Sequence, residues 1–305
     1  MKRFWKFGAV MVALALVAAA CGDDDADTDT TATTAAATTT STAPAGAVPG
    51  LVTEGSLILV TTGNFPPFTK INESTGDNEG YSIDVAKEIA SRLGLTIELP
   101  TVDFVAELEG LSQGLYDMAD SGIWPNAARQ EAGFVFSTPM TSTGIVAQVR
   151  AEDAATSPGL TMGAMAGLTV GGIQGSSQEA FVLDNADALG YDEYLGFTGA
   201  AEGLQALRQG RVDVLSQDTL VAGFASVTFD DLGVAGPTVE AHPLSITFRE
   251  GTEAKRDVID VVIKQMIADG AIADIQKKWF GTCLPIPDDI NAVGPYTTLP
   301  GGDCS

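Results

Sequence analysis

The sequence predicts an α/β protein built as two similar lobes with a cleft between them. Apolar runs typical of strands alternate with helical patterns from about residue 51 to residue 282. A helix–glycine–strand pattern occurs twice, at 108–122 and 204–218, with Leu, Leu, Gln, Gly and Asp at the same five positions. The length of this region suits one large domain or two lobes, and the repeat favours two.

The first half reads as strand, helix, strand, helix, strand. In chain order these elements are expected at 57–60, 81–94, 96–100, 108–114 and 115–120. Gly94 and Gly114 stand where helices commonly end, because glycine adopts the left-handed conformation without strain. This order indicates a mostly parallel sheet covered by helices.

The second half repeats this alternation. We expect strands at 168–173 and 212–218 and helices at 176–190 and 204–210. Helix–glycine–strand is common in α/β proteins, so a chance match is the alternative. Ligands of open α/β sheets bind beyond the carboxyl ends of the strands. Those ends are residues 120–122 and 216–218, and the cleft is expected between them.

The N-terminus reads as an export signal followed by a stalk. Residues 1–20 carry Lys2, Arg3 and Lys6 and then an apolar run too short to span a bilayer. Residues 18–21, AAAC, resemble a bacterial lipobox, by which Cys21 would become a lipidated N-terminus. Cleavage at an ordinary secretory site is the alternative. Residues 21–50 are rich in Thr, Ala and Asp and are expected to be a disordered stalk.

The cysteine and histidine content and the net charge of this exported chain limit which disulfides, metal sites and partners it can have. Cys283 and Cys304 lie in a turn-rich tail, 283–305, and are expected to form a disulfide, two free thiols being the alternative. One histidine and the absence of a Cys-x-x-Cys pair argue against a metal site, and no cofactor is expected. The net charge of −24 argues against nucleic acid as a partner.

Three places near the predicted strand ends could hold a ligand. Arg129 could bind a carboxylate bidentately, or be an ordinary surface arginine. Gly175, Ser176 and Ser177 open a helix whose N–H groups suit an anion, or form a plain N-cap. Asp218 could hold an ammonium group, or be a solvated strand end. Together, a carboxylate site and an ammonium site would suit an α-amino acid.

Several segments in order resemble the family 3 extracellular solute-binding proteins. They are GYSIDVAKEIASRLG, FVFSTPM, LTVGGIQGSSQEAF, LQALRQGRVDVLSQD and the closing ITFREGTEAKRDVIDVVIKQMIADGAIADIQKKWFG. The resemblance covers about residues 55–282. Members of this family are polar amino-acid receptors of ATP-driven importers. The resemblance implies the two-lobed, type II periplasmic-binding-protein-like fold.

The resemblance also implies how the chain is divided and where it binds its ligand. Lobe 1 would hold 51–146 and 244–282, and lobe 2 would hold 147–243, with crossings near 144–150 and 241–248. The α-carboxylate would pair with Arg129 and a backbone N–H of Ser176 or Ser177. The α-amine would pair with Asp218 and the carbonyl of Gly122. Phe65 would pack over the ligand and Phe104 would line the pocket.

The chain departs from the family pattern beside the arginine. Trp124 stands where Thr or Ser is usual, and Phe136 follows Arg129 one residue later than expected. Trp124 could stack on a ligand, contribute cation–π attraction, or fill space. Whether the pocket is reshaped for a ligand other than the commonest amino acids is left open. Glu79 and Asp120 could select a cationic side chain, or be plain surface acids.

We therefore expect a monomeric, membrane-tethered receptor that captures an amino acid or derivative and delivers it to an ABC permease. No enzymatic activity is expected, and His242, beside Pro243, is expected to be structural. If the lipobox is not used, the protein would be secreted or periplasmic. One alternative is an enzyme of the same fold, resembling prephenate or arogenate dehydratases. The other is a sensor that signals to a separate membrane partner.

Overall fold

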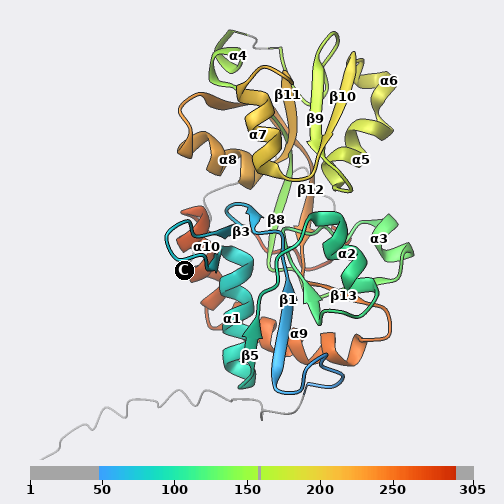
Figure 1. The fold of residues 1–305 in the computed structure, drawn as a ribbon, viewed down its shortest axis with the longest axis vertical. Helices are drawn as coiled ribbons and strands as arrows, with labels where there is room; N and C mark the ends of the chain where they lie inside the picture. Colours follow the sequence, from blue (N-terminus) through green and yellow to red (C-terminus); the bar gives the residue numbers. More distant parts are fainter. Residues whose placement is uncertain (1–47, 157–158, 293–305) are drawn as a thin grey trace, which may run out of the picture. The chain divides into compact units, whose positions relative to one another are not determined.

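The computed structural model describes residues 48–156 and 159–292 as two sheets flanked by helices (Figure 1). The predicted signal peptide, Cys21, nearly all of the stalk and Cys304 lie outside the described residues. The Cys283–Cys304 disulfide therefore stays a prediction. No helix in the described ranges is long and apolar enough to cross a membrane.

The first sheet has five strands in the order β5-β1-β6-β13-β7. Its strands are β1 (Ser56–Val60), β5 (Thr96–Glu98), β6 (Met118–Ala119), β7 (Phe134–Phe136) and β13 (Thr247–Arg249). Its helices are α1 (Tyr81–Leu93), α2 (Phe104–Ser112), α3 (Ala127–Glu131), α9 (Glu253–Ala268) and α10 (Ala271–Phe280). A small sheet of β2 (Asn64–Phe65), β3 (Thr69–Ile71) and β4 (Asn78–Glu79) lies between β1 and α1 in the chain.

The second sheet also has five strands, in the order β10-β9-β11-β8-β12. Its strands are β8 (Thr141–Arg150), β9 (Thr169–Ile173), β10 (Glu193–Phe197), β11 (Val214–Asp218) and β12 (Leu232–Leu244). Its helices are α4 (Ala151–Thr156), α5 (Ser177–Asp184), α6 (Ala186–Leu189), α7 (Ala200–Arg208) and α8 (Thr219–Thr228). We call the parts built on the two sheets the first and second lobes.

The two sheets share one plan. In each, a central strand, β1 or β9, pairs in parallel with a neighbour on either side, and two antiparallel strands complete the sheet. The predicted two-lobed α/β fold is therefore confirmed. The central strands are wholly buried or nearly so, because helices cover both faces of the sheet.

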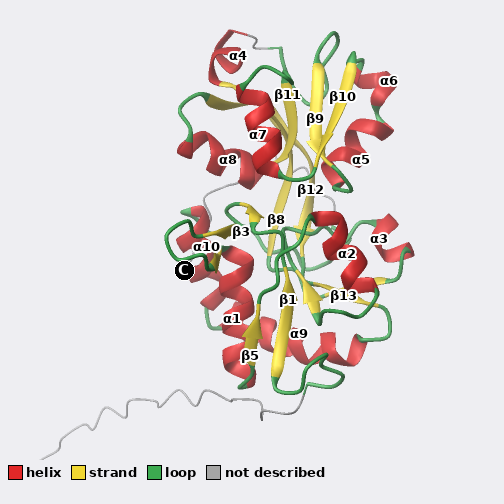
Figure 2. Cartoon of the chain, viewed as in Figure 1, coloured by secondary structure: helices red, strands yellow, loops and turns green. Residues whose placement is uncertain are grey.

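Two long strands, β8 and β12, carry the chain between the lobes (Figure 2). They pair with each other along their length, from Leu232↔Arg150 to Leu244↔Thr141. Both belong to the second sheet, so the chain passes between sheets just before Thr141 and just after Leu244. The predicted lobe boundaries at 146/147 and 243/244 fall within these strands.

Most predicted elements form near where the pattern placed them. The repeated helices begin four residues earlier than expected, at Phe104 and Ala200, and two other elements differ more. Helix α1 ends at Gly94, which adopts φ +67° and donates to the carbonyls of Ala90 and Ser91. The helix expected over 176–190 is instead two helices, because Asn185 ends α5 and its side chain bonds back to the carbonyl of Phe181. The strand expected over 115–120 is shortened to the two residues of β6.

Candidate functional site

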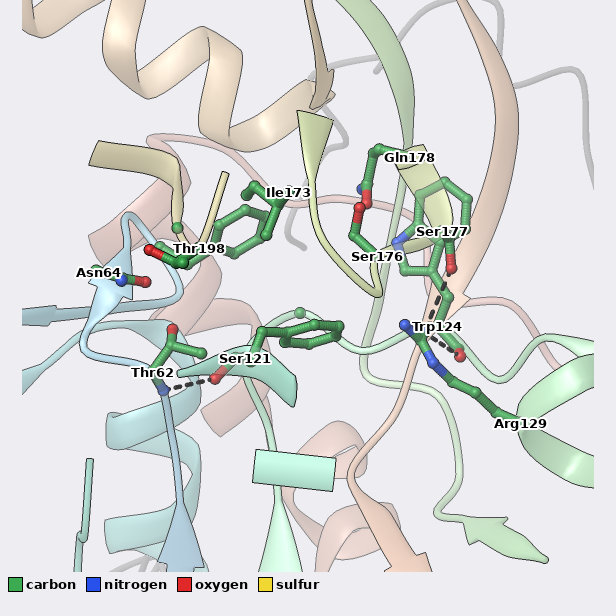
Figure 3. Close-up of a pocket in the computed structure, with 14 residues that line it drawn as sticks. Thr62, Asn64, Ser121, Trp124, Arg129, Ile173, Ser176, Ser177, Gln178 and Thr198 are labelled. Atoms are coloured by element: carbon green, nitrogen blue, oxygen red, sulfur yellow. Dashed lines mark hydrogen bonds between the residues drawn. The ribbon is translucent and has the colours of Figure 1, made fainter. Parts of the chain in front are cut away.

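A cavity with walls from both lobes lies at the carboxyl ends of the strands (Figure 3). It encloses about 390 Å³ of space free of protein atoms, including its opening to solvent. Most of the residues that line it follow β1, β6 and β10 or begin α2, α5 and α7, while Ile173 ends β9 and Arg129 lies on α3. They are Thr62, Asn64, Phe65, Phe104, Ser121, Gly122, Trp124, Arg129, Ile173, Ser176, Ser177, Gln178, Thr198 and Gly199.

Arg129 is the one charged residue in this lining. Its helix, α3, begins after Asn126, whose side chain accepts from the backbone N–H of Arg129 at 2.9 Å. The guanidinium donates to the carbonyl of Trp124 at 2.9 Å and the hydroxyl of Ser177 at 3.3 Å, and it lies 5.5 Å from the ring of Phe104. Figure 3 shows the guanidinium pointing toward Ser177. The side chain is thus held by neutral groups.

The guanidinium of Arg129 forms no ion pair with a described residue. Burial lowers the pKa of Arg129 to about 10, so the side chain is still cationic at neutral pH. The acid that interacts with it, Glu107, is fully buried on α2, and burial raises the pKa of Glu107 well above its ordinary value. No carboxylate of the described residues forms an ion pair with Arg129.

The N-terminus of α5 faces the same place from the second lobe. Ser176 caps this helix, and its hydroxyl accepts from the backbone N–H of Glu179 at 3.1 Å. The first residues of a helix present N–H groups that have no acceptor within the helix. The hydroxyl of Ser177 accepts from Asn126 at 3.0 Å as well as from Arg129. A guanidinium and a helix N-terminus thus converge on a site suited to an anion.

Asp218 does not line the cavity. It is fully buried at the start of α8, where Oδ1 accepts from Thr143 at 2.8 Å and from the backbone N–H groups of Leu220 and Val221. Oδ2 makes no hydrogen bond with the described residues. Burial raises the pKa of Asp218 to about 7, against these hydrogen bonds, which lower it. Asp218, the predicted partner of an ammonium group, therefore lies behind the cavity wall.

Trp124 forms the wall in front of Asp218. Its indole, 2% exposed, packs against the ring of His242 on β12, with centroids 4.4 Å apart and the rings inclined by 32°. The indole lies near enough to Asp218 to lower the pKa of that carboxyl. Its Nε1 nevertheless makes no hydrogen bond with the described residues. His242 therefore supports the indole from the crossover strand. Trp124 is thus a lining residue whose indole separates Asp218 from the cavity.

The other predicted site residues divide between the lining and its surroundings. Phe65, Phe104 and Gly122 line the cavity. A side chain at Gly122 (φ +73°) would approach Phe65 and Phe68 within 3.2 Å, so only glycine fits there. Gly175 lies behind the lining, and its carbonyl accepts from Arg129 at 3.4 Å. Neither suggested selector of a cationic side chain lines the cavity.

Those two acids have other partners. Glu79 pairs with Lys70 at 2.8 Å. Asp120 is buried rather than a surface acid, accepts from the backbone of Gly122 at 3.1 Å, and burial raises its pKa to about 6.

The sequence interpretation missed seven lining residues, most of them small and polar. They are Thr62, Asn64, Ser121, Ile173, Gln178, Thr198 and Gly199. Six of the seven lie one to four residues beyond a strand or at the start of a helix, and Ile173 is the last residue of β9.

Comparison with known proteins gives one consistent family. Residues 57–282 match Bacterial extracellular solute-binding proteins, family 3. The chain is 25% identical over 233 residues to the L-cystine-binding protein TcyA of Bacillus subtilis (strain 168), covering 75% of this chain and 82% of that protein.

Solved structures share the fold. An ancestral arginine-binding protein bound to arginine is 29% identical, with a TM-score of 0.66 over 74% of this chain and 99% of that one. The ancestral amino acid-binding protein AncCDT-1, a precursor of cyclohexadienyl dehydratase, is 24% identical, with a TM-score of 0.67 over 74% of this chain and 96% of that one.

Proposed function

Because the chain belongs to the bacterial extracellular solute-binding proteins of family 3, we propose that it captures an amino acid or amino-acid derivative between its lobes and delivers it to an ABC permease. The observation that carries this proposal is the cationic Arg129, which forms no ion pair with the described residues, opposite the N-terminus of α5. A ligand α-carboxylate would bind the guanidinium as a charge-assisted pair and accept from an N–H of Ser176 or Ser177. Contact with both lobes at once would favour the closed arrangement.

The α-ammonium group would bind the carbonyl of Gly122 and the carboxylate of Asp218. Gly122 lines the cavity, whereas Asp218 lies behind Trp124. A ligand with an ammonium group therefore requires the indole of Trp124 to rotate away from Asp218. The energetic reason to rotate is the ion pair, which would give the unpartnered Oδ2 a donor.

The remaining lining suits an uncharged, polar ligand side chain. Thr62, Asn64 and Thr198 offer hydroxyl and amide groups, and Phe65 and Ile173 offer apolar surface. No carboxylate is among the lining residues. A cationic side chain would lose its hydration there without gaining a counter-charge, which is unfavourable. We therefore place a neutral amino acid such as L-glutamine before L-arginine, and include L-cystine because of the relative named for it.

The family is extracellular, and the chain's location outside the cytoplasm follows from it. We further propose that residues 1–20 are removed as a signal peptide and that Cys21 carries the lipid anchor. Residues 21–50 would then be the stalk, and a Cys283–Cys304 disulfide would close the tail. The receptor would act as a monomer.

Thermal denaturation of residues 22–305, first unfolded and refolded to remove carried-over ligand, tests the proposal against all amino acids and common derivatives. A ligand at about 100 times its Kd adds roughly 2.7 kcal/mol to the free energy of unfolding, which raises the melting temperature clearly. Arg129→Ala should abolish the increase, because the carboxylate loses its counter-charge. Arg211→Ala, at an exposed arginine of the second lobe outside the lining, is the matched control.

Two results would contradict the proposal. One is a ligand whose stabilisation survives Arg129→Ala unchanged, because the anion site would then play no part. The other is turnover of prephenate by the purified protein, which would favour the dehydratase-like alternative. A panel without any stabilising compound would remove the amino-acid assignment.

A further inference from the structure

A short C-terminal segment beyond the family match is packed onto the molecule. The match ends at residue 282, and the structure describes the chain as far as residue 292. We call residues 283–292 the tail segment. Cys283 and Leu284 are 7% and 5% exposed, and Pro287 is buried. A segment buried to this degree contributes to the folded structure rather than hanging from it.

The tail segment is attached first at the crossing between the lobes. Gln276 on α10 accepts from the backbone N–H of Leu284 at 2.7 Å and donates to the carbonyl of Met140 at 3.0 Å. The hydroxyl of Ser142 on β8 donates to the carbonyl of Pro285 at 3.0 Å. Gln276 and Ser142 are each 1% exposed, so water does not compete for these bonds. The tail segment is thereby fixed to the start of β8.

Its far end is attached to the loop that carries Arg129. Ile290 packs against the apolar cluster that contains Ile123. The side-chain amide of Gln130 donates to the carbonyl of Pro125 at 2.8 Å and to Oδ1 of Asn291 at 2.9 Å. Pro125 directly follows Trp124, and Gln130 directly follows Arg129. A single amide therefore closes the loop across its two site residues and joins it to the tail segment.

The loop needs such support for a physical reason. Helix α3 has five residues, and a helix this short is not stable on its own. Arg129 is positioned by this helix, and Trp124 by the chain just before it. Asn291 is in turn held by a turn in which Asp289 accepts from its backbone N–H at 2.9 Å. The support therefore comes from an ordered segment.

We propose that the tail segment is a brace that orders the loop from Trp124 to Arg129 and so positions Arg129 for the ligand, with Ile290 and Asn291 as its positioning residues. Its consequence for affinity rests on the proposed function, because that function gives Arg129 its ligand. Its consequence for the loop does not, because Trp124 reports the loop's order in the empty protein. The two parts can therefore be tested separately.

The test uses residues 22–305 with Trp279→Phe, which leaves Trp124 as the only tryptophan. The double variant Ile290→Ala/Asn291→Ala is compared with Asp288→Ala, an exposed tail residue without a hydrogen bond to the described residues. Three quantities are measured: acrylamide quenching of Trp124 fluorescence, affinity for L-glutamine and for L-cystine, and the melting temperature of the empty protein. The double variant should increase the quenching of Trp124 and weaken binding about fivefold, the equivalent of ~1 kcal/mol. Asp288→Ala should leave both unchanged.

A purely structural role predicts a different result. In that case the double variant lowers the melting temperature but leaves quenching and affinity as in the parent, and the brace is overturned. Unchanged values of all three quantities overturn it as well. If the parent binds neither probe, the quenching of Trp124 alone decides the brace, while the amino-acid panel and Arg129→Ala decide the proposed function.

Discussion

The two repeated units, α2 with β6 and α7 with β11, use their shared aspartate for the same backbone task. Asp117 donates its N–H to the carbonyl of Ile58 on β1, and its Oδ2 accepts the N–H of that same residue at 2.9 Å. Asp213 makes the same pair of bonds with Thr169 on β9, the second at 3.0 Å. Each aspartate therefore fixes the register between its own strand and the central strand. The repeat in the sequence is a repeated way of joining two parallel strands.

The units differ in what balances the aspartate's charge. Asp117 pairs with Lys255 on α9, and the two side chains are 0% and 3% exposed. Asp213 pairs with Arg150 at 3.3 Å, and those side chains are 38% and 21% exposed. The same residue at the same place in the motif is thus part of a buried ion pair in one lobe and of a solvated one in the other. The contribution of each ion pair to the free energy of unfolding therefore depends on burial rather than on the motif.

The largest expected effect comes from removing this charge in each lobe. Asp117→Asn should lower the free energy of unfolding by about 3–5 kcal/mol, because Lys255 keeps its buried charge without a partner. Asp213→Asn should cost less than about 1 kcal/mol, because Arg150 stays partly hydrated and keeps Asp153 as a second partner. Urea denaturation at pH 7 measures both. Equal losses would mean that the shared backbone bonds, and not burial, dominate.

The strand ends of the two units carry a second pair of acids with a different pH dependence. Burial raises the pKa of Asp120 to about 6 and of Asp218 to about 7, from 3.8. Between about pH 4 and these values the folded protein binds more protons than the unfolded chain, so stability falls as pH rises. At pH 8, Asp218→Asn should stabilise the protein by about 2–4 kcal/mol and Asp120→Asn by about 1–3 kcal/mol. Urea denaturation at pH 5 and pH 8 should show the gain chiefly at pH 8.

Asp218→Asn also separates stability from binding. The asparagine keeps Oδ1 for Thr143, Leu220 and Val221 and removes the buried negative charge. If Asp218 holds the ligand's ammonium group, the variant should be more stable at pH 8 and bind the amino acid at least tenfold more weakly. A variant that gains stability and keeps its affinity would show that the ammonium group binds elsewhere. Asp120→Asn, which removes another buried acid that is not proposed to contact the ligand, is the control.

The sequence predicted what depends on neighbouring residues and missed what depends on distant ones. The helix ends at Gly94 and Gly114 follow from the conformational freedom of glycine, and both are confirmed. The Asp117–Lys255 pair joins residues 138 positions apart, which no local pattern indicates. The split of the helix at Asn185 was missed because an asparagine in a helical pattern carries no unambiguous signal.

The same limit applies to the candidate site. Arg129, Ser176 and Ser177 were found because a cation and a helix N-terminus have recognisable chemistry, and all three line the cavity. The position of Asp218 behind Trp124 could not be predicted, because it depends on the crossover strand that brings His242 against the indole. Asn64 and Thr198 were missed because neutral polar residues near short strands are common and carry no distinct signal.

The smallest effect tests whether the backbone of the two units is as alike as the hydrogen bonds indicate. Gly114 and Gly210 end their helices at φ +75° and +70°. Alanine at either position should cost roughly 1–2 kcal/mol, because this conformation brings Cβ against the following carbonyl. A Cβ at Gly114 would lie 3.1 Å from Nε of Arg249, and one at Gly210 would lie 3.9 Å from Nη1 of Arg150. Both neighbours are ends of flexible side chains, so the two losses in urea denaturation should differ little. If the two alanine variants differed in stability loss as much as Asp117→Asn and Asp213→Asn do, the units would differ in backbone as well as in charge.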